Sequence, residues 1–186
     1  MSKHSWMIRF ILPFWLLIGL ACGPCDFLSR EMPTPPRPLV VSTEAAAQLE
    51  ARIQQSLRGE PGQQFILRMT DVEVTSLVAS KLTEYEESPV TDPRIWFTKG
   101  KIYGTGRVEI FSIPTPFLII ASARIEDGQV VVTIEDSSAG VLPVPQKLLQ
   151  TISQSINETI RETQLDLEVT ALEILEGEII IKGTRK

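Results

Sequence analysis

The stretch that decides the fold runs from Arg94 to Asp136 and is RIWFTKGKIYGTGRVEIFSIPTPFLIIASARIEDGQVVVTIED. Apolar residues recur at every second position over much of it, which is the period of a β-strand. Lys99–Gly100 and Asp127–Gly128 mark tight turns between the apolar runs, and Asp-Gly is a strong hairpin signal. The stretch therefore predicts an antiparallel meander, which we expect the Ile113–Pro116 segment to interrupt.

Helices and further strands are predicted on both sides of this meander. Apolar spacing behind Ser42 or Thr43 predicts a first helix, and Thr70 with Glu73 forms a capping box at the start of a second one. Since helices and strands are segregated along the chain, we predict an α+β fold. Its expected architecture is an antiparallel curled β-sheet packed against a long C-terminal helix, with two shorter N-terminal helices. The predicted ranges are helices at 44–58, 70–82 and 146–163, and strands at 64–69, 165–170 and 179–182.

The first residues have the composition of an export signal. Lys3 and Arg9 precede a short apolar run at Phe10–Ala21, and Cys22 follows it. A basic start, an apolar run and a small-residue boundary are typical of a secretory signal, and the run is short for a membrane-spanning helix. The boundary Gly19-Leu20-Ala21-Cys22 resembles the lipobox of bacterial lipoproteins, in which the cysteine carries acyl chains.

Three fates of this leader stay open, namely lipidation at Cys22, an uncleaved signal anchor and full secretion. All three export the chain, so we expect it at the extracytoplasmic face of the cell membrane. The prolines of Met32–Pro38 favour an extended, semi-rigid spacer. We therefore predict a signal peptide or membrane anchor at 1–25, a Pro-rich linker at 26–41 and an α+β domain at 42–186.

Composition excludes most catalytic and metal chemistry from the main domain. After Cys25 the chain has no cysteine and no histidine, which excludes a His-based triad, a Cys nucleophile, a zinc site of the usual ligands and a disulfide framework. Cys22-Gly23-Pro24-Cys25 matches the thioredoxin motif, but no strand–helix–strand context surrounds it. Glu84, Glu86 and Glu87 are interpreted as a solvated helix end. The net charge of −5 argues against a nucleic-acid partner. We expect no enzyme, no cofactor and no metal.

Two segments carry a resemblance to a known group of proteins. Ile66–Leu77 resembles the strand, Thr-x-x-Glu and helix opening of bacterial envelope lipoproteins of the YpmS-like group. Ala139–Pro145, followed by Leu148 and Leu149, resembles the entry to their long helix. The likeness covers about Pro61 to Gly183. More distantly, the layout is similar to TULIP-like lipid-binding domains. This resemblance implies a curled sheet around a helix that holds acyl chains, and it carries over no catalytic or metal-binding residue.

The strongest candidate site is an apolar groove between the sheet and the long helix. Both strand faces are apolar at Phe117–Ile120 and Val130–Val132, whereas a one-sided sheet should alternate, so both faces need cover. A filled core is the alternative interpretation of the same residues. We expect a non-catalytic, membrane-anchored protein that binds a lipid or another apolar ligand. An interaction module that binds a protein partner in an envelope complex is the second hypothesis. The predicted lining is Phe117, Ile119 and Ala121 from the sheet, and Ile152, Ile156 and Ile160 from the helix.

Overall fold

The computed structural model describes residues 32–83, 90–110, 113–139, 142–143, 150, 153–154, 157, 161 and 166–186. Met32–Lys186 belongs to one compact unit. Cys22 and the rest of the leader lie outside the described residues, as do Glu84, Glu86 and Glu87. The described residues belong to the predicted domain and to the segment that leads into it.

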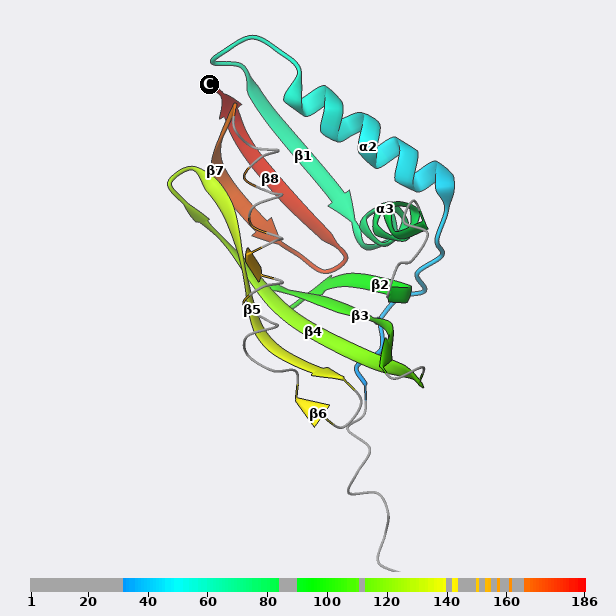
Figure 1. Ribbon diagram of the computed structural model, residues 1–186. Helices are drawn as coiled ribbons and strands as arrows, with labels where there is room; N and C mark the ends of the chain where they lie inside the picture. The colour runs from blue at the N-terminus through cyan, green and yellow to red at the C-terminus, as the bar shows by residue number, and fades with distance from the viewer. Residues whose placement is uncertain are drawn as a thin grey trace, which may run out of the picture. The chain divides into compact units, whose positions relative to one another are not determined.

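The described part is mostly β and forms two antiparallel sheets (Figure 1). One sheet has three strands in the order β1-β8-β7, and the other has five in the order β2-β3-β4-β5-β6. The helix α3 follows β1 directly and packs against β2, while α2 packs against α3 and β1. The elements are α2 (Thr43–Leu57), β1 (Gln64–Thr70), α3 (Asp71–Thr83), β2 (Val90–Thr98), β3 (Lys101–Ile110), β4 (Ile113–Glu126), β5 (Gln129–Ala139), β6 (Leu142–Pro143), β7 (Leu167–Ile174) and β8 (Glu178–Arg185).

The prediction of one curled sheet against a long C-terminal helix is wrong. The strands are divided between two sheets, and the helices whose bounds the structure gives are α2 and α3, with no long C-terminal helix among them. The predicted helix at 146–163 lies largely outside the described residues. The physical reason for the second sheet is a long-range pairing. The N-terminal strand β1 pairs with β8 from Gln64↔Thr184 to Thr70↔Glu178, so the closing hairpin builds a sheet of its own.

The prediction that prolines interrupt the meander is also wrong. The strand β4 begins at Ile113 and continues through Pro114 and Pro116, which pair with Glu109 and Arg107 of β3. The pairing of β4 with β5 begins only at Phe117. Proline is tolerated where a strand has a free edge, because the missing N–H is not needed there. The two prolines occupy the part of β4 that has no paired neighbour on the β5 side.

The two sheets share one hydrophobic core. Aromatic and branched side chains from one face of each sheet meet in it, and they leave little exposed surface. Burial of this kind is the main favourable contribution to folding. Strands in which apolar and polar residues alternate therefore place their apolar face inward, as expected. The buried members of this core cluster are Phe65, Phe97, Val130, Leu167, Val169, Ile179 and Ile181.

Side chains from outside the five-stranded sheet contact the backbone of its edge strand β2 and the outer side of β5. At the β2 edge, the Thr75 hydroxyl accepts from Ile95 N (2.9 Å) and donates to Ile95 O (2.8 Å). The carboxylate of Asp71 accepts from Phe97 N at 2.9 Å. Unpaired edge groups invite association with other strands, so these contacts protect the edge. Thr75 and Asp71 are four residues apart, which places them on one face of α3.

On the outer side of β5, away from the short pairing with β6, a side-chain amide contacts the backbone of Val132. Val132 N donates to Asn157 Oδ1 at 2.8 Å, and Asn157 Nδ2 donates to Val132 O at 2.9 Å. The sequence places Asn157 on the polar face of its predicted helix and in a glycosylation sequon. Its amide is instead half-buried and engaged at both ends. A carboxamide presents one donor and one acceptor side by side, which matches one residue of a strand edge.

The capping box at the start of α3 is confirmed. Thr70 N donates to Glu73 Oε2 at 2.9 Å, and Glu73 N donates to Thr70 Oγ1 at 3.4 Å. Glu73 also forms an ion pair with Arg52 of α2 at 2.6 Å. Burial raises the pKa of Glu73, but the hydrogen bonds from Thr70 and Arg52 outweigh it and lower the pKa from its ordinary value of 4.5. The ionised Glu73 carboxylate therefore joins the start of α3 to Arg52 of α2.

We expect Glu73→Gln to reduce the free energy of unfolding at pH 7 by about 1 kcal/mol, because glutamine keeps the reach of the cap but loses its charge. A lowered folded-state pKa stabilises above the unfolded value and loses this effect as pH falls through the folded value. The difference between wild type and variant should therefore shrink once the pH falls below 4.5, and it should disappear as the pH falls through the lowered folded-state pKa of Glu73. Denaturant unfolding across pH measures it, and a difference that persists in acid would contradict this assignment.

Candidate functional site

The predicted sheet half of the groove lies on one face of β4. Phe117, Ile119 and Ala121 share this face with Ala123 and Ile125, which pack against the core cluster. Phe117 and Ile119 are half-buried, and Ala121 is buried. These three side chains do not belong to the core cluster, so the face continues beyond the two-sheet core. Ile152, Ile156 and Ile160, the predicted helix half, lie outside the described residues.

Two glycines of β3 shape this part of the sheet. Gly106 pairs with Phe117, and a Cβ at Gly106 would lie 2.8 Å from the Phe117 ring. Gly104 pairs with Ile119, and a Cβ there would meet only Ile119 Cβ, at 4.0 Å, among the described atoms. The ring of Phe117 therefore packs over one glycine, while the space above the other is open in the described part. We call Gly104, Gly106, Phe117 and Ile119 the apolar strip.

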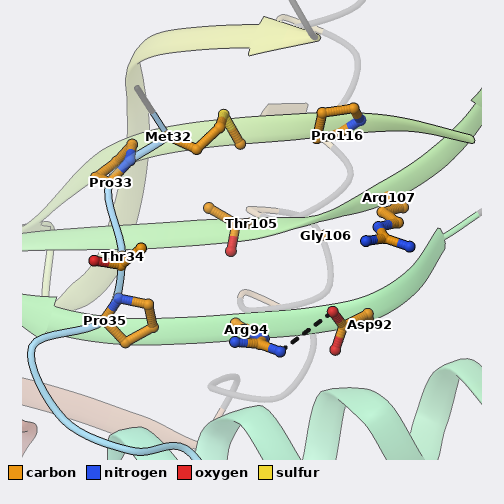
Figure 2. A pocket seen from close by; sticks show the side chains of 10 residues that line it. All are labelled: Met32, Pro33, Thr34, Pro35, Asp92, Arg94, Thr105, Gly106, Arg107 and Pro116. Atoms are coloured by element: carbon orange, nitrogen blue, oxygen red, sulfur yellow. Dashed lines mark hydrogen bonds and ion pairs between the residues drawn. The ribbon is translucent and has the colours of Figure 1, made fainter. Parts of the chain in front are cut away.

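A pocket lies on the opposite face of the same strands. Its cavity volume is about 270 Å³, and the extended segment Met32–Pro35 forms one wall (Figure 2). Strands β2, β3 and β4 form the rest. Thr105 and Arg107 alternate with the glycines of the strip along β3, so they face the other way. We call this the arginine pocket; it is lined by Met32, Pro33, Thr34, Pro35, Asp92, Arg94, Thr105, Gly106, Arg107 and Pro116.

The charges in the arginine pocket are two guanidinium groups and one carboxylate. Arg94 contacts Asp92 through one long ion pair, with Nη2 and Oδ2 3.4 Å apart, and both side chains are half-exposed. Arg107 is exposed and has no hydrogen-bond or ion-pair partner among the described residues. Figure 2 shows Arg107 across the pocket from Arg94 and Asp92. The lining residues that the structure describes thus carry an excess of one positive charge, whereas the net charge of the whole chain is −5.

An irregularity in β2 brings Asp92 to the rim of the pocket. The register between β2 and β3 shifts between Thr91 and Arg94, and Asp92 has a positive φ of 51°. Aspartate and asparagine are the non-glycine residues that best tolerate this conformation. The bulge re-aims the side chains that follow it. The two residues between Thr91 and Arg94 are absent from the pairing, and Arg94 then pairs with Thr105 on the pocket face.

The segment that precedes the domain is attached to it by Arg37. Arg37 donates to Asp71 Oδ2 from Nη2 (3.0 Å) and Nε (3.3 Å), and to Phe97 O from Nη2 (3.3 Å). The turn between β7 and β8 completes the group, because Gly177 N donates to Phe97 O and Asp71 N donates to Gly177 O. The Lys99 N–H and the Thr98 hydroxyl lower the pKa of the neighbouring Glu176 carboxyl. This buried polar junction had no sequence signal beyond the capping box beside it.

The described residues of the strip and of the pocket form no group of side chains that is typical of a catalytic site. No group of three or more His, Cys, Asp or Glu residues that could hold a metal is present in the described part of the chain. Within the same residues, no helix is long and apolar enough to cross a membrane. The arrangement offers an apolar surface on one sheet face and a cationic recess on the other. Both features suit binding.

Comparison with known proteins gives no further assignment. No family model matches the chain, and no curated protein matches it.

Proposed function

We propose that this protein is a membrane-anchored, extracytoplasmic, non-catalytic protein that binds a lipid or another apolar ligand at the apolar strip. The observation that carries the proposal is the continuation of the inward apolar face of β4 beyond the shared core. Phe117 and Ile119 are half-buried there, and the space above Gly104 is open in the described part. Apolar surface that remains partly exposed in the described part of the chain favours an apolar ligand.

The leader supports the location in this proposal. A basic start, an apolar run and Cys22 are typical of exported lipoproteins. Each buried methylene group contributes about 0.8 kcal/mol, so acyl chains on Cys22 would hold the domain at a membrane. The domain is then within reach of lipid. The resemblance to lipid-binding envelope domains points the same way.

Lipid cross-linking of the full-length protein tests the proposal. We would reconstitute the protein in vesicles that contain phosphatidylglycerol with a diazirine in one acyl chain. After irradiation, mass spectrometry should find lipid on peptides of β4 as well as on the leader. Ile119→Asn should reduce the β4 adducts about tenfold, because burying an isoleucine side chain contributes about 1.5–3 kcal/mol. The intact mass of the protein also shows whether Cys22 is acylated.

The matched control is Ile66→Asn, since Ile66 is an exposed isoleucine on β1 of the other sheet. This change should leave the amount of β4 adducts unaltered. The amount of adducts on the leader should be the same for all variants, which shows that they insert equally into the vesicles. Adducts on the leader alone would contradict the ligand proposal. In that case, protein cross-links at the strip would favour the interaction module instead.

A further inference from the structure

We propose that the arginine pocket is an anion site that binds a phosphate group, with Arg107 as its principal ligand and Arg94 and Thr105 as further donors. The phosphate could come from a lipid headgroup or from a soluble phosphate compound. The site lies on the sheet face opposite the apolar strip, so it is independent of the proposed lipid site there.

The partners of the other strand arginines single out Arg107. Arg68 pairs with Glu178, Arg124 with Glu126, and Arg185 donates to Gln63 and to two backbone carbonyls. Arg94 has its pair with Asp92. Among the strand arginines of the described residues, Arg107 alone is left without a partner. Its five N–H donors are therefore available, and their fork geometry matches two oxygens of one phosphate.

The surroundings of Arg107 favour an anion of small size. The pairings Arg94↔Thr105 and Thr91↔Arg107 place Arg94, Thr105 and Arg107 on the same face of neighbouring strands. Their side chains line a cavity of about 270 Å³ that the Met32–Pro35 segment bounds on one side. Two guanidinium groups and a hydroxyl can surround a phosphate from different directions. Among the described residues of the lining, Asp92 is the only acid, and its ion pair with Arg94 is long.

The position of the pocket brings lipid headgroups within range. Met32, the first described residue, lines it, and the predicted anchor at Cys22 lies ten residues earlier in the chain. Ten extended residues span at most about 35 Å, which is the largest separation that the chain allows between Met32 and a membrane-attached Cys22. Access to lipid headgroups depends on the anchor in the proposed function, whereas binding of a soluble phosphate does not.

The test uses full-length protein in neutral detergent micelles and measures the thermal unfolding midpoint against ligand concentration. A ligand that binds the folded state raises this midpoint by an amount that depends on its Kd. One arm adds inorganic phosphate against chloride at equal ionic strength. The other arm adds dioleoyl phosphatidic acid against dioleoylglycerol, which has the same chains without the phosphate. We expect stabilisation only by the phosphate-containing member of a pair.

Two pocket variants should change the apparent Kd in opposite directions. Arg107→Gln should weaken binding about tenfold, because it removes a charge-assisted hydrogen bond. Asp92→Asn should strengthen binding, since it removes the competing carboxylate and still tolerates the positive φ of 51°. The matched control is Arg58→Gln, a change of equal charge at an exposed arginine outside the pocket.

The outcomes separate the two sources of phosphate. An Arg107-dependent effect in both arms means that the phosphate group is sufficient, and an effect in one arm alone identifies the lipid or the soluble source. The proposal is overturned if neither arm responds, or if Arg58→Gln weakens binding as much as Arg107→Gln does. Loss of the site would leave lipid cross-linking at the apolar strip unaffected, so the two proposals can fail separately.

Discussion

Asp71→Ala is expected to reduce the free energy of unfolding by about 3 kcal/mol, because the change leaves buried polar groups without partners. The Asp71 side chain is only 5% exposed, and it accepts hydrogen bonds from Phe97 N and from two nitrogens of Arg37. Its removal leaves the Phe97 N–H buried at the edge of β2. The junction also includes the turn between β7 and β8, so both sheets should be affected. Denaturant unfolding measures the loss.

Arg37→Ala is the matched control for this prediction. The Arg37 side chain is 41% exposed, and Asp71 retains the hydrogen bond from Phe97 N without it. We expect a loss of about 1 kcal/mol, as for other partly exposed ion pairs. Equal losses in the two variants would show that the ion pair, and not the covered strand edge, is the important contact.

Gly183→Ala is expected to destabilise the domain by about 3 kcal/mol through overpacking. Gly183 of β8 pairs with Phe65 of β1 and with Val169 of β7. A Cβ at this position would collide with the Glu168 carbonyl oxygen and would lie 2.8 and 2.9 Å from two atoms of the Phe65 ring. The carbonyl belongs to a paired strand and cannot move without breaking the sheet. The free energy of unfolding is again the measurement.

Gly104→Ala provides the comparison for this substitution. Both glycines lie within strands and neither has a positive φ, so the two variants differ mainly in the space around the new methyl group. Because a Cβ at Gly104 meets only Ile119 Cβ at 4.0 Å, the stability should change by less than about 1 kcal/mol, and an increase is expected. A similar loss in both variants would contradict the steric explanation.

The same arrangement of an aromatic ring over a glycine occurs in both sheets. Phe65 lies across from Gly183, and Phe117 lies across from Gly106. The sequence does show that Gly104 and Gly106 share the apolar face of their strand. It does not show which ring fills the space, because that depends on the register of the neighbouring strand.

The sequence by itself determined the local elements of this protein. Ser42 caps α2, Thr70 and Glu73 cap α3, and the turns at Gly100 and Gly128 connect strands at the predicted places. These features depend on side chains a few residues apart and on glycines with positive φ, so short stretches of sequence specify them. The apolar faces of the strands followed in the same way from their period of two.

Only the tertiary structure decided how these elements pair and which polar groups meet. The pairing of β1 with β8, the attachment of Arg37 to Asp71 and the contact of Asn157 with Val132 join residues that are 25 or more positions apart. No local pattern specifies such contacts, because several strands present equally apolar faces and edge groups. The combined burial and edge hydrogen bonding of the folded domain select among them. The arginine pocket exists for the same reason, since β2, β3, β4 and the Met32–Pro35 segment form it only when the chain is folded.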